Sequence, residues 1–319
     1  MPKTTSNKAA QPPKGYGPFT PQMAWNLSAP HTWPAAIIPV AISVAAASVT
    51  QGSVSVSLSV VLLCICILMQ SSVNTFNDYY DYVKGLDSKE DNLDPSDAVL
   101  LYNNVNPKSA LVFAIGLLVA AFLLGAYAIY CAGPIPLIIG VIGALFVVIY
   151  SAGKTPISSL PLGEVVSGFV MGGLIPLACY QVLTGMLSPL MLVWALPVML
   201  GIGLIMMTNN TCDLEKDIPA QRKTLPVLLG RVRARALYHS IVYIWVALIV
   251  LIVALFFSPG LIVMPFMLLS AYPLLKALLS NPLVNQSRIG AMAQICSVNI
   301  ALGSWYVAAM LASSITLTM

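Results

Sequence analysis

The sequence predicts an all-α integral membrane protein with about nine transmembrane helices around a central cavity. Composition is the first reason: 58% of the 319 residues are hydrophobic, 8% are charged, and the mean hydropathy is +0.87. A soluble domain has about a quarter of its residues charged. The second reason is that the apolar residues fall in successive runs close to the roughly 20 residues that a spanning helix needs.

Nine apolar runs are expected to cross the bilayer, each separated from the next by a short turn or a polar loop. They are 33–50, 56–76, 109–131, 135–150, 162–183, 189–208, 237–257, 261–279 and 289–316. The fourth run is short for a bilayer core about 30 Å thick, and the ninth is long. Glycine and proline within these runs suit the close packing and kinks that membrane helices tolerate.

The charges predict the orientation of these helices. All 15 Lys and Arg residues lie in the N-terminal tail or near the even-numbered connections, and the connections near 51–55, 132–134, 184–188 and 258–260 carry none. By the positive-inside rule, the N-terminus is expected to be cytoplasmic. All 11 acidic residues fall on the same side. We therefore expect a multi-pass protein of the plasma membrane whose active face meets the cytoplasm.

The chain is expected to have one membrane domain and no separable soluble domain. Residues 1–24 are rich in Pro, Gln, Lys and Gly, which is typical of a flexible cytoplasmic tail, and the domain covers 25–319. Its two long cytoplasmic loops are 77–108 and 209–236. Because the membrane topology accounts for the basic residues, nucleic acid is not an expected partner, whereas the lipid bilayer is.

Each long loop begins with a cluster of Asn and Asp residues at the end of an apolar helix. The first acid cluster comprises Asn74, Asn77, Asp78, Asp81, Lys84 and Asp87, and the second comprises Asn209, Asn210, Asp213 and Asp217. Residues three or four apart share a helix face, so each cluster presents a stripe of oxygen atoms at the membrane rim. Facing carboxylates repel unless a cation lies between them, and oxygen-only sites suit Mg²⁺ bridged to phosphate. The clusters therefore indicate diphosphate chemistry on a lipid-soluble substrate.

This chemistry predicts a role for each candidate residue. About two Mg²⁺ ions would be held by Asn77, Asp78, Asp81, Asp87, Asp213 and Asp217 and would neutralise charge on the leaving diphosphate. Tyr150 and Lys154 join the four clustered aspartates as candidate catalytic residues, with Tyr150 beside the allylic cation and Lys154 on the phosphates. The candidate substrate-binding residues are Asn74, Asn77, Lys84, Asn209, Asn210, Arg222 and Lys223.

Other interpretations of the same residues stay open. The clusters would be solvated loop charges in a protein without this chemistry, Tyr150 would be an interfacial anchor, and Glu164 would be either a buried partner of a lysine or a contact of the acceptor. A secondary transporter would also carry intramembrane acids. It would normally place them near the bilayer midplane, whereas these lie at one rim.

Several motifs together resemble the UbiA superfamily of membrane prenyltransferases. They are Pro30-His-Thr-Trp-Pro34, the two acid clusters, Tyr150-Ser-Ala-Gly153, Leu162-Gly163-Glu164 and the segment from Arg222 to Gly230. Within the superfamily the chain is most similar to 1,4-dihydroxy-2-naphthoate polyprenyltransferases of menaquinone biosynthesis. The resemblance implies Mg²⁺-dependent transfer of a polyprenyl group from polyprenyl diphosphate to that acceptor, which yields demethylmenaquinol, CO₂ and diphosphate.

The chain departs from that subfamily at three positions. Ala29 and Cys212 stand where these enzymes usually have arginine, and Lys154 stands where many have proline. The departures concern the aromatic acceptor more than the diphosphate. Alternative acceptors within the superfamily are therefore 4-hydroxybenzoate and haem.

Overall fold

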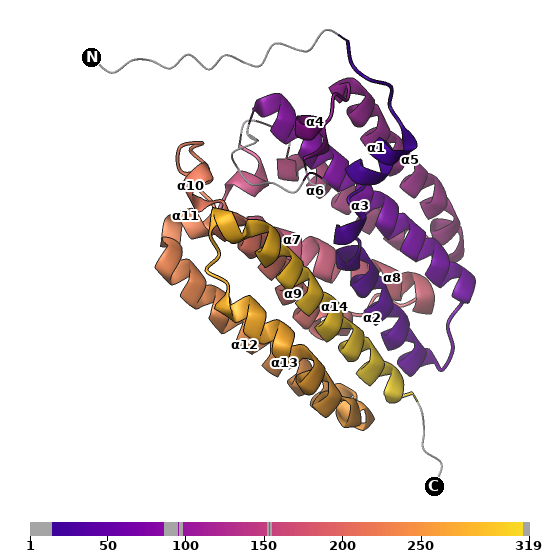
Figure 1. Ribbon diagram of the computed structural model, residues 1–319. Coiled ribbons are helices and arrows are strands. Elements are labelled where there is room, and N and C mark those ends of the chain that lie inside the picture. Colours follow the sequence, from indigo (N-terminus) through magenta and orange to yellow (C-terminus); the bar gives the residue numbers. More distant parts are fainter. Residues whose placement is uncertain (1–14, 86–94, 96–97, 152, 154, 315–319) are drawn as a thin grey trace.

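Every regular element is helical in the computed structural model, which describes residues 15–85, 95, 98–151, 153 and 155–314 (Figure 1). The elements that build the bundle are α1 (Pro21–Leu27), η1 (Pro30–Thr32), α2 (Pro34–Gln51), α3 (Val56–Lys84), α4 (Val99–Tyr102), α5 (Pro107–Ala132), α6 (Ile135–Ser151), η3 (Ile157–Ser159), α7 (Gly163–Phe169), η4 (Val170–Leu174), α8 (Ile175–Thr184), α9 (Leu190–Cys212), α10 (Leu214–Asp217), α11 (Leu225–Leu229), α12 (Arg231–Phe256), η5 (Ser258–Val263), α13 (Met264–Ser280), η6 (Asn285–Ser287) and α14 (Arg288–Ala312).

The nine expected spans correspond to helical segments of the structure. Within the described residues, eight segments are long and apolar enough to cross a membrane, with α7, η4 and α8 counted as one segment. The ninth is α6, which has 17 residues and matches the expected short fourth span. The prediction of an all-α membrane protein is confirmed. The orientation of the termini stays a prediction.

Several helices have bounds that differ from the expected spans, and two differences bear on the site. The helix α3 continues past the expected end at 76 to Lys84, and it ends where Gly85 adopts a left-handed φ of 66°. The members of the first acid cluster from Asn74 to Lys84 therefore lie on one continuous helix. At the other end, α1 begins at Pro21, within the segment expected to be a tail, because Thr20 caps it by accepting from the amide of Met23. Leu27, the last residue of α1, is buried.

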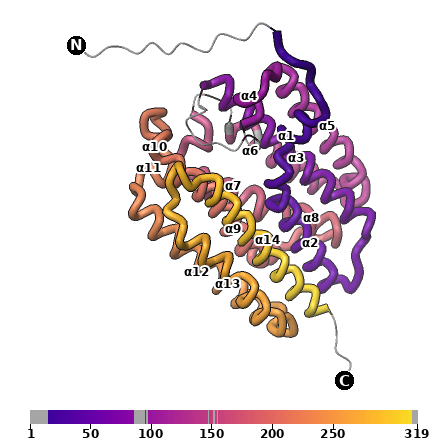
Figure 2. The backbone as a smooth tube through the Cα atoms, viewed as in Figure 1, coloured from indigo at the N-terminus to yellow at the C-terminus, as the bar shows by residue number. Residues whose placement is uncertain are grey.

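The long helices form a ring. Neighbouring pairs pack in the order α2–α3, α3–α5, α5–α6, α6–α8, α7–α9, α9–α14 and α14–α2, and α12 and α13 pack outside α9 and α14 respectively. The tube view shows α12 and α13 along the outer side of α14 (Figure 2). A ring of helices leaves a space at its centre, as the sequence predicted.

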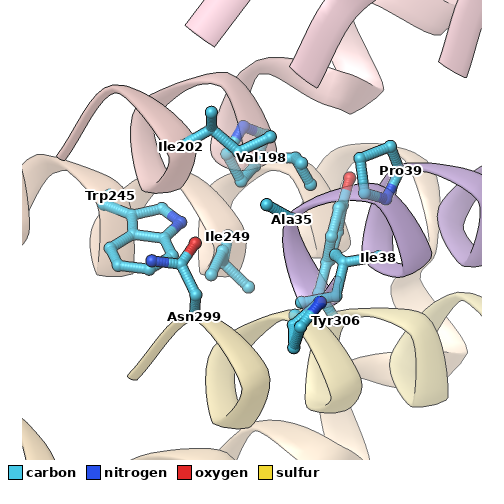
Figure 3. A pocket seen from close by; sticks show the side chains of 12 residues that line it. Ala35, Ile38, Pro39, Val198, Ile202, Trp245, Ile249, Asn299 and Tyr306 are labelled. Atoms are coloured by element: carbon cyan, nitrogen blue, oxygen red, sulfur yellow. The ribbon is translucent and has the colours of Figure 1, made fainter. Parts of the chain in front are cut away.

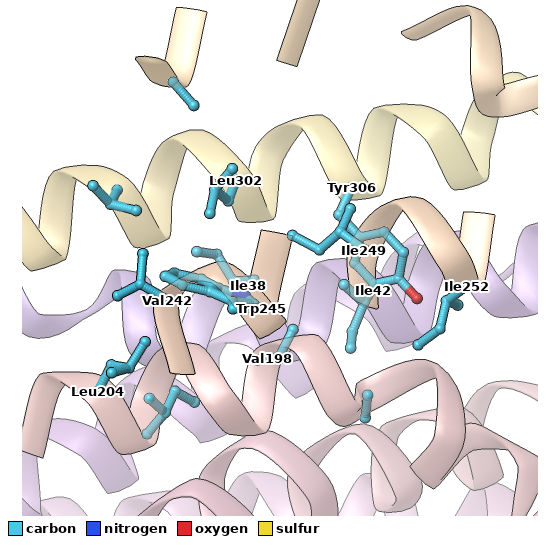
Figure 4. Close-up of a cluster of buried hydrophobic side chains, with 14 of the residues drawn as sticks. Ile38, Ile42, Val198, Leu204, Val242, Trp245, Ile249, Ile252, Leu302 and Tyr306 are labelled. Atoms are coloured by element: carbon cyan, nitrogen blue, oxygen red, sulfur yellow. The ribbon is translucent and has the colours of Figure 1, made fainter. Parts of the chain in front are cut away.

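The largest buried cluster lies on one side of this ring, between α2, α9, α12 and α14. Trp245, Ile249 and Tyr306 pack there against Ile38, Ile42, Val198 and Leu302 (Figure 4). The Tyr306 hydroxyl donates to the carbonyl of Trp194 at 2.8 Å. Beside this cluster is a gap of only about 10 Å³, next to Trp245 and Asn299 (Figure 3). This side of the bundle is close-packed, so the space for a ligand lies elsewhere.

Two glycines bring α7 and η4 close to α9. A Cβ atom on Gly172 would lie 2.6 Å from the backbone N of Met199, and one on Gly168 would lie 2.6 Å from the Met199 carbonyl oxygen. Only glycine allows backbones to approach this closely. The residues of η4 form a π-helical turn, a feature that often occurs beside functional sites. Val170 and Met171 of this turn line the central cavity.

Candidate active site

The centre of the ring holds a cavity of about 530 Å³ with a polar part and an apolar part. Its polar wall consists of side chains near the ends of α3, α6, α9 and α14, which are Asn74, Asn77, Asp78, Asp81, Tyr150, Asn209 and Arg288. Turns further into the bundle contribute apolar side chains, including Phe146, Met171, Ile202, Ile205, Met206 and Met292. The cavity therefore suits a molecule with a charged head and an apolar tail.

Asn74 fixes the start of the first acid cluster to the N-terminal segment. Its side-chain amide donates to the Thr32 hydroxyl at 2.8 Å and to the Ser28 carbonyl at 3.0 Å. Gln70, one turn earlier on α3, donates to the Asn74 oxygen at 3.2 Å. Asn74, a predicted substrate-binding residue, lines the cavity. Its bonds show that it also positions the α1–η1 wall.

Asp78 connects the first cluster to the far end of the long loop. Its carboxylate accepts from the backbone N of Val99 at 2.9 Å and from that of Leu100 at 3.3 Å, at the start of α4. The side chain is buried yet touches the cavity. A carboxylate at a helix N-terminus is stabilised by the unpaired N–H groups there. Asp78 therefore holds the start of α4 against α3 as well as lining the site.

Asn77 and Asp81 share the cavity-facing side of α3. Both line the cavity and are half-buried. Lys84 follows at the exposed end of the helix, where its ammonium lies 5.5 Å from the centre of the Tyr80 ring. The remaining member of the first cluster, Asp87, lies outside the described residues, and so does Lys154.

The second acid cluster is held by arginines. Asp213 follows the last residue of α9, and its Oδ1 accepts from Arg288 Nε at 3.0 Å. The same guanidinium donates through Nη2 to the Asn209 side-chain oxygen. Asp213 is 4% exposed and Arg288 is 6% exposed, so this ion pair is buried. Arg288 and Asn209 line the cavity, whereas Asp213 is not among the described residues that line it.

Asp217 has a separate arginine. Its Oδ1 accepts from Arg222 Nη1 at 2.9 Å, and its Oδ2 accepts from the Thr224 hydroxyl at 3.2 Å. The second nitrogen of that guanidinium, Nη2, donates to the Ser158 carbonyl at 2.8 Å. Asp217 is completely buried, and burial raises its pKa, although Arg222 pulls the pKa in the opposite direction. Asp213 and Asp217 are therefore each paired with a different arginine.

Two further predicted residues lie beside this region. The Asn210 amide donates to Glu164 Oε1 at 2.8 Å, which makes Asn210 a link to α7. Glu164 thus has an amide partner, not the lysine considered from the sequence. Its second oxygen and the Tyr150 hydroxyl are buried, and neither has a hydrogen-bond partner in the described part of the chain. The Lys223 side chain is exposed, while its backbone N donates to the Ser159 carbonyl at 2.8 Å.

The oxygen atoms of the first cluster suit a hard cation such as Mg²⁺, because they are carboxylate and amide oxygens at the polar wall. Among the described residues, no three His, Cys, Asp or Glu side chains lie close enough together to hold a metal. In this structure Asp213 pairs with Arg288, and Asp217 pairs with Arg222. These carboxylates would reach a metal only if their arginines released them.

Sequence reasoning missed Arg288, which was interpreted only as a topology signal. Its place at the start of the last apolar run was the available clue, since a charged residue there is costly unless it has a partner. That partner, Asp213, is 75 residues away in the chain. Gln70 and Ser167 also line the cavity and were not singled out. Thr32 lines it too; its motif was noted, but no role was assigned to it.

Comparisons with known proteins identify the family of the chain. The model of the UbiA prenyltransferase family matches residues 36–298. The chain is 29% identical to 1,4-dihydroxy-2-naphthoate octaprenyltransferase of Bacillus subtilis, over 73% of this chain and 77% of the relative. It is 28% identical to UbiA prenyltransferase domain-containing protein 1 of Danio rerio, over 87% of this chain and 80% of the relative.

Solved structures support the fold. A UbiA homolog from Archaeoglobus fulgidus bound to GPP and Mg²⁺ superposes with a TM-score of 0.61 at 16% identity, over 90% of this chain and 99% of that chain. The apo structure of a UbiA homolog from Aeropyrum pernix K1 gives a TM-score of 0.63 at 16% identity, over 88% and 98% of the two chains. The chain belongs to the UbiA prenyltransferase family and is a membrane enzyme that transfers prenyl groups.

Proposed function

We propose that the enzyme transfers a polyprenyl group from polyprenyl diphosphate to 1,4-dihydroxy-2-naphthoate, with Mg²⁺ as cofactor, and forms demethylmenaquinol, CO₂ and diphosphate. The observation that carries this proposal is the divided cavity, which has an oxygen-rich wall at the helix ends and apolar turns behind it. A prenyl diphosphate has the same division, with a charged head and a long apolar tail.

The proposed metal-binding residues come from both acid clusters. Asn77, Asp78 and Asp81 would hold Mg²⁺ at the polar wall. Asp213 and Asp217 would contribute to a second position once Arg288 and Arg222 release them. When bound, Mg²⁺ supplies positive charge for the diphosphate oxygens. Arg222, Lys154 and Lys223 are the proposed additional phosphate contacts, and Lys84, Asn74, Asn209 and Asn210 orient the same wall.

The proposed reaction separates charge and then rejoins it. The allylic C–O bond breaks, and its electron pair leaves with the diphosphate. The electron-rich naphthalene ring then forms a C–C bond to the allylic carbon, and loss of the carboxylate as CO₂ restores the aromatic ring. Water would convert the allylic cation to an alcohol, so the apolar lining around Phe146 and Met206 protects it. Tyr150 is placed at the cavity wall, where its ring would face the cation.

The acceptor is supported by the Bacillus subtilis relative, whose name specifies 1,4-dihydroxy-2-naphthoate. Two ring hydroxyls activate this acceptor, so it needs no strong protein base. Ala29, at the cavity wall, occupies the position where the resembling naphthoate enzymes usually have arginine. The alternative acceptor, 4-hydroxybenzoate, is therefore tested beside it.

The decisive assay uses the purified full chain in detergent or nanodiscs, with one polyprenyl diphosphate and Mg²⁺. We expect prenylation of 1,4-dihydroxy-2-naphthoate with equimolar release of ¹⁴CO₂ from the labelled carboxylate, and little or no product from 4-hydroxybenzoate or haem. The reverse preference would overturn the acceptor while leaving prenyl transfer intact. No transfer to any of the three acceptors would contradict the proposed reaction.

The proposed location is the plasma membrane, with both acid clusters facing the cytoplasm. It rests on the absence of Lys and Arg from the odd-numbered connections. In a cysteine-free background, an impermeant thiol reagent added to intact cells should label a cysteine at Ser53 or Met186 and should fail at Gln221, although all three positions are exposed. Labelling only at Gln221 would mean that the protein has the opposite orientation in the membrane.

A further inference from the structure

Arg288 occupies an unusual position in the candidate site. It is the first residue of α14, it lines the cavity, and it is 6% exposed. Its guanidinium donates to Asp213 through Nε and to Asn209 through Nη2. An ion pair this deeply buried is costly to form and is therefore worth explaining. Both of its partners belong to the second acid cluster.

The loop before α14 holds Arg288 in place. The Asn281 oxygen accepts from the backbone N of Leu283 at 2.9 Å and from the Ser287 hydroxyl at 2.8 Å, and the Asn281 amide donates to Gln294 at 2.9 Å. Arg231, at the start of α12, donates to the carbonyls of Leu283 and Thr211. These bonds connect the loop to α9, α12 and α14, so the backbone at Arg288 has little freedom to move away from the cavity.

The guanidinium and a divalent cation need the same oxygen atoms. Arg288 Nε lies 3.0 Å from Asp213 Oδ1, within hydrogen-bond distance of the carboxylate. A metal at Asp213 would bring two positive charges next to that guanidinium, and like charges disfavour each other strongly in a buried site. Asp213 therefore cannot serve the metal and Arg288 equally well at the same time.

A diphosphate removes this conflict. Its oxygens accept two parallel N–H bonds from a guanidinium, as a carboxylate does. We infer that Arg288 changes partners: it neutralises Asp213 in the substrate-free enzyme and binds the diphosphate when Asp213 turns to the metal. This inference rests on the proposed function. It makes Arg288 a substrate-binding residue that also couples metal binding to diphosphate binding.

The coupling predicts opposite effects on two affinities. In Arg288→Gln, Asp213 loses the guanidinium that competes with the metal, so the affinity for Mn²⁺ alone should rise by about fivefold or more. The affinity for inorganic diphosphate at saturating Mn²⁺ should fall by about tenfold, because the guanidinium contact is lost. A residue that only braces α14 against α9 would lower both affinities.

The test measures free Mn²⁺ by electron paramagnetic resonance and diphosphate binding by calorimetry, on the full chain in detergent. Arg233→Gln is the matched control, since it removes the same charge from an exposed position of α12, and both affinities should stay within about twofold of wild type. Opposite shifts in Arg288→Gln support the inference. Shifts in the same direction, or no shift, overturn it.

A second variant keeps the test decisive if Arg288→Gln does not fold. Arg288→Lys retains the charge that neutralises Asp213 but has no fork for two parallel bonds. We expect its Mn²⁺ affinity to stay within about twofold of wild type and its diphosphate affinity to fall several-fold. Wild-type affinity for both ligands would overturn the inference. If the wild-type enzyme binds neither Mn²⁺ nor diphosphate, the proposed function itself fails.

Discussion

The two acid clusters have matching residue types and helical spacing but different surroundings. In the first cluster, Asn77 and Asp81 face the cavity from a continuous helix, and Asp78 touches it while capping α4. In the second cluster, Asp213 and Asp217 lie where α9 ends and α10 begins, and each is paired with an arginine. Both clusters lie at the same end of the bundle, around α4, α10 and α11 (Figure 1).

The difference shows that buried carboxylates can be neutralised in more than one way. Clustered acids imply a positive partner, and the sequence analysis identified that partner as Mg²⁺. In the second cluster the structure supplies guanidinium groups instead, from Arg222 and Arg288. The first cluster therefore offers oxygen ligands directly to the cavity. The second cluster would contribute its carboxylates as ligands only after its ion pairs rearrange.

Metal removal should have the largest effect. EDTA should reduce prenyl transfer to background, because both proposed metal positions depend on a hard cation, and Mg²⁺ should restore it. The measurement is product formation by chromatography before and after addition of Mg²⁺. Full activity in excess EDTA would contradict a metal role for either cluster.

Removal of single carboxylates should have the second largest effect on activity. Asp81→Ala should lower turnover by about a hundredfold or more, since an electrostatic contact to the leaving group is lost. Asp78→Ala, Asp213→Ala and Asp217→Ala should also each reduce turnover by orders of magnitude without loss of folded protein. Glu215→Ala is the control, since its side chain is 63% exposed and bonds Arg231 at the surface. Near-normal turnover in the double variant of Asp213 and Asp217 would remove the second cluster from the mechanism.

Loss of a cation should lower the free energy of unfolding more in the second cluster than in the first. Arg222→Gln leaves the completely buried Asp217 without its guanidinium and should lower the free energy of unfolding by about 2 kcal/mol. Lys84→Gln removes an exposed cation from the first cluster and should cost less than about 1 kcal/mol. Chemical denaturation in detergent measures both values. Equal losses would mean that the arginine pair adds no special stability.

The smallest effect should be a pH dependence. Burial raises the pKa of Asp217 above 3.8. Its contribution to stability is therefore complete below pH 3.8 and is lost as pH rises through the folded-state pKa. Arg222→Gln removes the charge that opposes this shift, so its stability deficit should be larger at pH 8 than at pH 4.5. Denaturation curves at both values test the sign, and a deficit that grows toward acid would refute it.

Much of the fold follows from the sequence because membrane helices are marked by length and hydropathy. The eight long spans and the short α6 were visible as apolar runs. The helical end of α3 was not, because residues 77–84 are polar and the stop depends on the left-handed Gly85. The turn η4 also escaped prediction, since it depends on how Gly168 and Gly172 meet Met199 of another helix.

The candidate site was only partly predictable, because several of its contacts join residues that are far apart in the chain. Local spacing identified the acids, and Arg222 was predicted as a phosphate contact without its ion pair to Asp217 five residues away. The contacts of Asp78 with α4, of Asn210 with Glu164 and of Asp213 with Arg288 join residues that are far apart in the chain. Helical periodicity carries no information about such tertiary partners. The sequence therefore predicted the positions of the acids but not the ion pairs that neutralise two of them.

The most direct test of this account is a structure of the enzyme with Mn²⁺ and an unreactive prenyl thiodiphosphate, with Mn²⁺ located by anomalous scattering. The account predicts metal beside Asn77 and Asp81, Asp213 turned from Arg288 toward a second metal, and Arg288 bound to the diphosphate. It would be contradicted by an intact Arg288–Asp213 pair with the diphosphate bound away from both clusters.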